Sequence, residues 1–191
     1  MILFDIDFMA NVIIRNASIE DAPLVARCTM AAIGIYDFSF LVPENEEFYR
    51  KLVEVCSRTD TLYSYANSRV VFIGETAIGC LISYPGDNYI AARELTFGLL
   101  DFDGSDTEIE TEPGEYYLDS MAILPSFRGN SIGKVLLTDG IDRGLAQGYK
   151  KVTLIVSKDK PRLHDYYLSI GFKDVKELKA FGEDYIKMAF S

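Results

Sequence analysis

The sequence predicts an α/β (α+β) domain with a mixed sheet and one parallel crossover. The first observation is the predicted order of elements, which runs strand–helix–helix–hairpin and then strand–helix–strand–helix–strand–strand. The second is the run 152–156, which is rich in β-branched residues and typical of a buried parallel strand. The third is the length of 191 residues without a linker or repeat, which favours a single domain over residues 1–191.

The first half of the chain contains one strand, two helices and a hairpin. The strand at 12–14 is followed by Ser18 and Asp21, which resemble a capping box and open a helix that runs to about Ile33. Pro43 and the acids after it begin a second helix. Its apolar stripe consists of Phe48, Leu52 and Cys56. Two strands joined by a two-residue turn then form a hairpin, at 69–73 and 76–84.

The second half of the chain alternates helices and strands. Its predicted elements are a helix at 89–100, a strand at 116–124, a helix at 131–147, a strand at 152–156, a helix at 161–169, and strands at 172–178 and 185–190. The helix at 131–147 stacks Leu137, Ile141 and Leu145 at a spacing of four. Three glycines on the same helix, Gly133, Gly140 and Gly144, indicate close packing on a sheet because each lowers helix propensity.

Composition and charge limit the classes of partner. With a net charge of −10 the chain is not expected to bind nucleic acid or a membrane. Three cysteines without a CxxC pair, together with a single histidine, indicate free thiols in the cytoplasm and no metal site. Residues 1–8 carry two acids and no base, unlike a signal peptide, so we expect residues 1–10 to be an N-terminal extension, with Met9 the more natural start.

The segment 101–115 holds seven acidic residues and no basic one. Such a segment is typical of a solvated, mobile loop. The alternative interpretation is an acidic rim that attracts a cationic substrate.

A small-residue turn precedes the helix at 131–147. The stretch from Arg128 to Lys134 reads RGNSIGK, and it leads directly from a strand into a helix. The first N–H groups of a helix have no internal partner and carry the positive end of its dipole, so this geometry suits an anion. Residues 126–162 carry eight Lys and Arg against three Asp and Glu, which supports an anion site; chance clustering on an exposed helix is the alternative.

The stretch from Ile123 to Gly133 resembles motif A of the GCN5-related N-acetyltransferases (GNAT), which reads Q/R-x-x-G-x-G/A after a strand. Arg128 takes its first place and Gly133 its last, while Ser131 stands where the middle glycine is usual. Tyr167 and the following Leu-Ser-Ile-Gly-Phe resemble the family's Y-x-x-x-G-F segment; Lys160 replaces the asparagine usual before it. The resemblance spans about residues 11–190.

The resemblance implies a mostly antiparallel sheet with flanking helices and acetyl-CoA as co-substrate. Its pantetheine would pair with the backbone of Met121 and Ile123, where strands 116–124 and 152–157 splay apart. Its pyrophosphate would rest on the amides of the turn, namely those of Arg128, Gly129, Asn130, Ser131, Ile132, Gly133 and Lys134. Tyr167 is the candidate acid beside the CoA sulfur, with a core aromatic as the alternative.

The general base is less closely specified. Alternation along the strand puts Asp119 on the same face as Met121 and Ile123, so Asp119 is the candidate, with Glu115 and Tyr117 as rivals. His164 and Asp165 are interpreted as helix surface, because no nucleophile elbow accompanies them.

Together these features predict an N-acetyltransferase that moves an acetyl group directly to a primary amine of a small, cationic acceptor. A non-catalytic acyl-CoA-binding regulatory module and a protein N-terminal or lysine acetyltransferase are the alternatives. The C-terminal strands expose edges that favour a homodimer.

Overall fold

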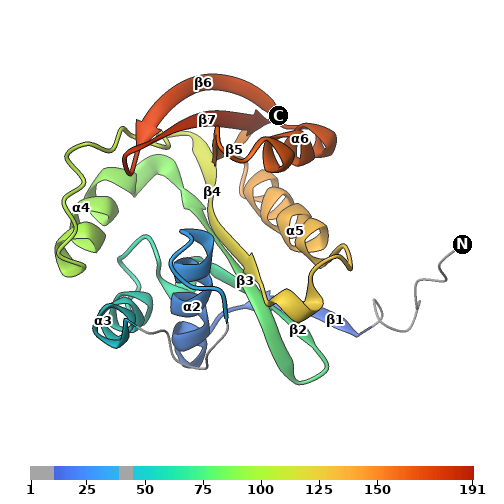
Figure 1. Ribbon diagram of the computed structural model, residues 1–191. Coiled ribbons are helices and arrows are strands. Elements are labelled where there is room, and N and C mark those ends of the chain that lie inside the picture. The colour runs from blue at the N-terminus through green and yellow to red at the C-terminus, as the bar shows by residue number, and fades with distance from the viewer. Residues whose placement is uncertain (1–10, 39–44) are drawn as a thin grey trace, which may run out of the picture. The chain divides into compact units, whose positions relative to one another are not determined.

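The structure is a computed structural model that describes residues 11–38 and 45–191 (Figure 1). These residues fall into two compact units. The first, the N-terminal unit, contains the described residues up to 82 together with 120–138. The second, the C-terminal unit, contains 83–119 and 139–191. The N-terminal extension expected over residues 1–10 lies outside the described residues, as do Pro43 and Glu44 at the expected start of the second helix.

The predicted mixed sheet is confirmed. Seven strands follow the hydrogen-bonded order β1-β2-β3-β4-β5-β7-β6. The strands are β1 (Val12–Asn16), β2 (Ser68–Ile73), β3 (Thr76–Pro85), β4 (Glu115–Ile123), β5 (Lys151–Ser157), β6 (Lys173–Ala180) and β7 (Glu183–Phe190). Strands β4 and β5 are parallel, while the pairs β1–β2, β2–β3, β5–β7 and β6–β7 are antiparallel.

Five α-helices accompany the strands in the described part of the chain. They are α2 (Ala22–Ala32), α3 (Glu46–Cys56), α4 (Tyr89–Leu99), α5 (Ile132–Ala146) and α6 (Pro161–Ile170). Short 3₁₀ turns stand at Ile19–Asp21, Tyr65–Asn67, Gly86–Asn88 and Pro125–Phe127. The first of these occupies the predicted capping box, where the Ser18 amide donates to Asp21 Oδ2 at 2.8 Å, so that α2 itself begins only at Ala22.

The core of the N-terminal unit forms where α2 and α3 lie side by side (Figure 1). Helix α3 is capped by Asn45, whose side chain accepts from the Phe48 amide at 3.1 Å. The predicted stripe of α3 is confirmed at Leu52 and Cys56, which are fully buried, while Phe48 is half-buried. Strand β3 approaches β4 closely in this unit, since Gly79 leaves no room for a Cβ against the Ala122 carbonyl.

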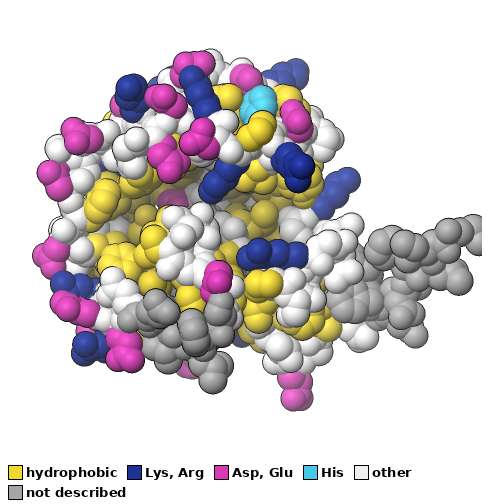
Figure 2. Space-filling model, in the orientation of Figure 1, with side chains coloured by type: hydrophobic (Ala, Val, Ile, Leu, Met, Phe, Trp, Pro, Cys, Tyr) yellow, Lys and Arg dark blue, Asp and Glu magenta, His cyan; other side chains and the backbone are white. Residues whose placement is uncertain are grey.

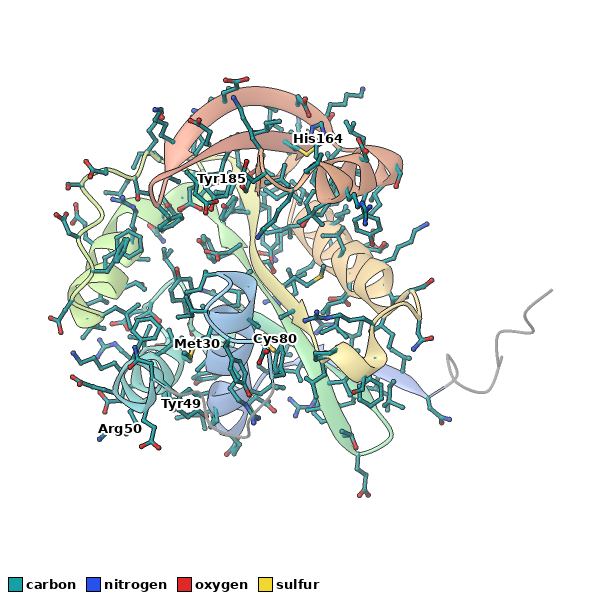
Figure 3. The ribbon with its side chains drawn as sticks, in the orientation of Figure 1. Met30, Tyr49, Arg50, Cys80, His164 and Tyr185 are labelled. Atoms are coloured by element: carbon teal, nitrogen blue, oxygen red, sulfur yellow. The ribbon has the colours of Figure 1, made fainter. Side chains whose placement is uncertain are left out.

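The three cysteines are free, as expected. They are distant in sequence but lie near one another in the core of the N-terminal unit. Cys28 and Cys80 share a hydrogen bond that raises the pKa of the Cys80 thiol, and burial raises it further. Burial likewise raises the pKa of Cys56. Figure 3 marks Cys80 and the buried Met30. Thiols held protonated away from water are weak nucleophiles, so Cys56 and Cys80 act as packing groups.

Helix α5 corrects one predicted contact. Leu137 and Ile141 are buried as predicted, but Leu145 is 40% exposed. The neighbouring Gly144 takes the inward position instead, and a Cβ there would come within 2.7 Å of the Tyr116 ring. Because successive helical residues point about 100° apart, the chain gives this face to glycine and turns Leu145 outward. The close packing on the sheet that was predicted for the glycines of this helix is therefore found at Gly144, against Tyr116 of β4.

Charged side chains cover the hairpin of β6 and β7 in the C-terminal unit. Figure 2 shows basic and acidic side chains beside one another over this hairpin. Lys158 pairs with Glu177 at 2.6 Å, and Lys176 pairs with Glu112 at 3.1 Å. Strand β6 ends the strand order, as expected for an edge, but these charges make its edge less open to pairing.

Candidate functional site

The turn before α5 is built from backbone in unusual conformations. Gly129 has φ +83° and Ser131 has φ +59°, both in the left-handed region that favours glycine. Ser131 therefore occupies the place of the motif's middle glycine in the conformation that a glycine would adopt. Left-handed backbone at these two residues turns the chain from β4 into α5.

Unpaired amides stand at the start of α5. The first intrahelical bond runs from the Val135 amide to the Ser131 carbonyl, at 3.1 Å. The amides of Ile132, Gly133 and Lys134 precede it, and among the described residues they show no hydrogen bond to the turn before the helix. Helix α5 is 15 residues long, and the positive end of its dipole lies at these amides. The turn can thus bind a phosphate group through the backbone.

The other predicted cofactor residues surround this turn within the N-terminal unit. The Arg128 side chain donates from Nε to the Ile123 carbonyl at 2.9 Å, so it braces the turn against the end of β4. Met121 is half-buried, and its Cε lies 3.9 Å from the position that a Cβ on Gly133 would take. Asn130 is half-buried. The structure thus brings Met121, Ile123, Arg128 and Gly133 together.

The parallel ladder between β4 and β5 is short. It joins Glu115 to Tyr117 with residues 151–153 and then ends. Strand β5 continues to Ser157, where it is paired with β7 on its other side. Within the C-terminal unit, Leu118 and Asp119 therefore leave the parallel ladder, as expected where these strands splay.

Asp119 belongs to a cluster of carboxylates and tyrosines in the C-terminal unit. Tyr84, on β3, donates from its hydroxyl to Asp119 Oδ2. Glu110, on the loop before β4, accepts from the Tyr89 hydroxyl at 2.9 Å and from the Tyr117 hydroxyl at 2.6 Å. The ring of Tyr84 packs between those of the other two tyrosines, with centroids 6.3 Å from Tyr89 and 5.7 Å from Tyr117. We call these five residues the carboxylate–tyrosine cluster.

Electrostatics inside the cluster favour retained protons. Burial, and next the negative charge of Asp119, raise the pKa of Glu110 to about 7, against hydrogen bonds from Tyr117 and Tyr89 that lower it. Burial and the neighbouring carboxylates raise the pKa of Tyr84, Tyr89 and Tyr117, which stay protonated. A negative charge on Asp119 therefore opposes ionisation of Glu110 in this poorly solvated site.

Both rivals for the base make other contacts. Glu115 is buried in an ion pair, with Lys187 Nζ at 2.6 Å from its Oε2. Its Oε2 also accepts from the Thr111 hydroxyl and the Glu112 amide. Tyr117 donates its proton to Glu110. Glu115 therefore serves to hold the loop and β7 together, and Asp119 is the half-exposed carboxylate on this strand.

Most residues of the acidic segment 101–115 are exposed, as its composition predicts, but Thr107, Glu110, Thr111 and Glu115 are buried. Arg93, on α4, holds it by donating to the carbonyls of Gly104 and Thr107 at 2.7 and 2.9 Å. The Glu108 amide donates to the Lys179 carbonyl at 2.9 Å, which ties the segment to β6. These contacts fold the loop inward and leave Glu110 only 7% exposed. At Glu110 the segment therefore buries an acidic side chain instead of presenting it at the surface.

Tyr167 lies on α6 apart from the carboxylate–tyrosine cluster. Its ring packs 5.8 Å from Tyr166 and 5.9 Å from Phe172, centroid to centroid. Its hydroxyl has no hydrogen-bond partner in the part of the chain that the structure describes. Burial raises the pKa of Tyr167 to about 12. The phenol is therefore protonated at neutral pH and able to donate.

His164 pairs with a residue other than the one beside it in sequence. Its Nε2 lies 2.7 Å from Asp174 Oδ1 on β6 (His164 is labelled in Figure 3), and Asp165 is exposed. No group of three His, Cys, Asp or Glu side chains suited to a metal occurs among the described residues.

Comparisons with known proteins decide the family. A sequence model of the Acetyltransferase (GNAT) family matches residues 31–172. The chain belongs to this acetyltransferase family. The match covers motif A and Tyr167, and it extends over parts of both units. The predicted family and enzyme class are confirmed at this level. No curated protein matches the chain.

Solved structures agree with this GNAT assignment. The chain is similar to a crystal structure of an acetyltransferase, with 27% identity, TM-score 0.74, and coverage of 93% of this chain and 97% of that one. It has the fold of an N-acetyltransferase from Staphylococcus aureus Mu50, at 20% identity and TM-score 0.75, covering 93% and 100%. It also has the fold of one chain in the crystal structure of the NatC complex bound to Gag peptide and CoA, at 14% identity and TM-score 0.56, with coverage of 94% of this chain and 98% of that one.

Proposed function

We propose that this GNAT chain is an acetyl-CoA-dependent N-acetyltransferase that transfers the acetyl group directly to a primary amine of a small, cationic acceptor. The observation that carries the proposal is the turn at Gly129 and Ser131, which presents unpaired amides at the start of α5 in a chain of this family. Backbone amides and a helix dipole suit a pyrophosphate, which acetyl-CoA carries.

The residues of the turn fit the cofactor through backbone groups. The amides from Arg128 to Lys134 would hold the pyrophosphate, and the Lys134 side chain, exposed near the turn, adds positive charge. The Arg128 guanidinium is engaged by the Ile123 carbonyl through Nε, so it shapes the turn as well as adding charge. The backbone of Met121 and Ile123 would align the pantetheine. Acetyl-CoA, when bound, supplies the thioester carbonyl that the amine attacks.

Asp119 is the residue we assign to the proton of the amine. An alkylammonium with a pKa near 10.4 costs roughly 4–5 kcal/mol to deprotonate at pH 7. A carboxylate positioned to accept this proton lowers the free-energy barrier to attack by the amine. The Tyr84 hydroxyl donates to one oxygen of Asp119 and fixes its orientation. The carboxylate can then attract the ammonium and accept its proton.

Tyr167 is the residue we assign to the departing thiolate. Its phenol remains protonated at neutral pH, since burial raises its pKa to about 12. A thiolate is a weaker base than such a phenolate, so Tyr167 would stabilise the leaving sulfur by donating a hydrogen bond rather than by losing its proton outright.

The acidity of the chain supports a cationic acceptor. The net charge is −10, and two acidic side chains meet in the carboxylate–tyrosine cluster. A small-molecule amine is therefore our first choice. A protein N-terminus or lysine is the alternative, since a structure of similar fold is bound to a peptide. A non-catalytic acyl-CoA-binding module is the other, carried because Ser131 and Lys160 depart from the residues usual in the family motifs.

The proposed setting of this activity is the cytoplasm, in keeping with three free cysteines. None of the helices in the described residues is long and apolar enough to cross a membrane. We propose neither nucleic acid nor a membrane as partner. Because β6 is an edge strand, we propose that the chain can form a homodimer. A metal is not part of the proposed chemistry.

The test is release of CoA thiol from acetyl-CoA across a panel of polyamines, aminosugars, amino-acid derivatives and peptides. We expect turnover with one class of amine. In Tyr167→Phe, kcat should fall roughly a hundredfold, while Tyr166→Phe, the matched control on the same helix, should keep it. Unchanged kcat in Tyr167→Phe would remove that assignment. Stabilisation of the fold by acetyl-CoA with no turnover on any amine would favour the binding module.

A further inference from the structure

Three phenylalanine rings meet where the end of α4 lies against the turn between β6 and β7, within the C-terminal unit. The ring centroids of Phe97 and Phe102 are 5.0 Å apart, and that of Phe181 is 6.4 Å from the first and 6.0 Å from the second. Phe97 is buried, whereas Phe102 and Phe181 are 43% and 42% exposed. We call these three residues the aromatic patch. Exposed rings that touch one another form a contiguous apolar surface, which is the kind of surface that binds a partner.

Hydrogen bonds fix the segments that carry the aromatic patch. The Phe102 amide donates to the Phe97 carbonyl at 2.9 Å, which folds the chain back on the end of α4. The Phe181 amide donates to the Thr107 hydroxyl at 3.1 Å, which joins the β6–β7 turn to the acidic segment. The end of α4, the acidic segment and the β6–β7 turn therefore present one surface that is already in place before a partner arrives.

Phe181 occupies a backbone position that disfavours it. Together with Gly182 it forms the two-residue turn from β6 to β7, and the two residues have φ +53° and +77°. Such a turn prefers asparagine, aspartate or glycine, and left-handed backbone is uncommon for a bulky side chain. Asp101, just before Phe102, has φ +53° as well. An exposed ring that strains its own turn is better explained by contact with another molecule than by packing.

Acidic side chains border the aromatic patch. Residues 97–109 hold four acids and no base, and two more acids follow the turn. All six are exposed: Asp101, Asp103, Asp106, Glu108, Glu183 and Asp184. Figure 2 shows acidic side chains beside hydrophobic ones on the side of this unit where α4 lies. The charge of this border suits a basic partner and opposes an acidic one.

The aromatic patch already holds one cation of its own chain. The Cζ atom of Arg93 lies 4.7 Å from the centroid of the Phe97 ring, and its Nη2 donates to two carbonyls of the acidic segment. A guanidinium therefore stacks on a ring and meets oxygen acceptors at this place. The exposed rings of Phe102 and Phe181, with carboxylates around them, offer the same chemistry to a guanidinium from outside.

We propose that the aromatic patch and its acidic border bind an arginine-containing segment of a partner protein. The guanidinium groups of the segment stack on Phe102 and Phe181 and pair with the carboxylates beside these rings, while an apolar side chain of the segment covers the remaining ring surface. Arginine suits this surface better than lysine because its planar, weakly hydrated guanidinium stacks on aromatic faces. This binding goes beyond the proposed acetyl transfer, and the partner need not be acetylated.

The experiment is calorimetric titration of the full chain with a short synthetic peptide in which arginine and serine alternate around one leucine. Matched peptides carry lysine or glutamate in place of arginine. We expect the arginine peptide to bind more tightly than the lysine peptide, the glutamate peptide not to bind, and added salt to weaken the binding. Equal binding of the arginine and glutamate peptides would overturn the proposal.

Two variants locate the binding on the surface. In Phe181→Asn the arginine peptide should bind about fivefold more weakly, because one stacked ring is lost. Leu145→Asn is the matched control: it changes a side chain of similar exposure, 40%, on α5, and should bind the peptide as the wild type does. Wild-type affinity in Phe181→Asn would overturn the proposal.

Thermal denaturation and sedimentation separate this role from the other uses of the surface. Asparagine suits left-handed backbone, so Phe181→Asn should unfold at or above the wild-type temperature. A lower unfolding temperature together with weaker binding would make Phe181 a packing residue and overturn the proposal. Self-association of the wild type that disappears in Phe181→Asn would assign the surface to a second copy of this chain and overturn it too.

Discussion

The turn at 128–134 and the carboxylate–tyrosine cluster are built on opposite principles. The turn offers backbone amides, depends on left-handed φ at two residues and is largely exposed. The cluster offers side chains, depends on burial, and leaves Tyr84, Tyr89 and Tyr117 less than 5% exposed. A backbone site should tolerate side-chain exchange and fail when its dihedral angles change. A buried side-chain site should respond to the loss of a single oxygen.

The largest expected effect is that of Asp119→Asn. An amide cannot accept the amine's proton, so kcat/KM should fall roughly a thousandfold, which is within the usual worth of general base catalysis. The matched control is Asp87→Asn, because Asp87 also accepts from a tyrosine hydroxyl, that of Tyr149 at 2.7 Å, outside the cluster. Steady-state kinetics at saturating acetyl-CoA measure both. A loss of less than threefold in Asp119→Asn would place the base elsewhere.

The second effect is the pH dependence of stability. The folded-state pKa of Glu110 is raised from 4.5 to about 7, so its protonated form is the one compatible with the fold. Its contribution is fully present below pH 4.5 and is lost as pH rises through about 7. Relative to Glu110→Gln, the wild type should lose on the order of 1–3 kcal/mol of unfolding free energy across that window. Urea titrations from pH 4.5 to 8 measure the difference, and parallel curves would argue against a raised pKa.

The sequence predicted the first of these regions far better than the second. A turn can be recognised locally, since Arg128, Gly129 and Gly133 keep fixed spacings after a strand. Motif resemblance located it, and the structure shows that Ser131 has left-handed backbone at the place of the motif's middle glycine. The order of strands and helices was predictable for a related reason, because β-branched runs and caps act over a few residues.

The cluster depends on contacts between distant segments. Glu108, Glu110 and Glu112 stand at a spacing of two, and nothing local separates the middle one from the others. Glu110 is buried because Arg93 binds the carbonyls of Gly104 and Thr107, and no local pattern predicts that contact. Strand alternation along β4 identified Asp119 as a candidate. Nothing in the sequence, however, singles out the three tyrosines of the cluster from the twelve in the chain. Side-chain sites of this kind need the tertiary structure.

A third, smaller effect is expected for Gly129→Ala. An added Cβ would meet nothing within 4 Å, so the cost comes only from φ +83°, at about 1–2 kcal/mol of stability. Gly114→Ala is a matched control, with φ +86° and equally open surroundings in the loop before β4. Both variants should lose similar stability by thermal denaturation. Only Gly129→Ala should also weaken acetyl-CoA binding by calorimetry, and equal affinities in the two variants would contradict a backbone site at the turn.

The smallest expected effect is a gain. Ser131→Gly relieves a serine held at φ +59°, while the added freedom of the unfolded chain offsets part of the relief, so stability should rise by less than about 1 kcal/mol. Ser131→Ala removes the hydroxyl but keeps the strain, so it should show no such gain. Glycine also lets a phosphate approach the amides more closely, and acetyl-CoA affinity should rise a few-fold. A tenfold loss of affinity in both variants would instead make the Ser131 hydroxyl a ligand, and the turn would then resemble the cluster in depending on a side chain.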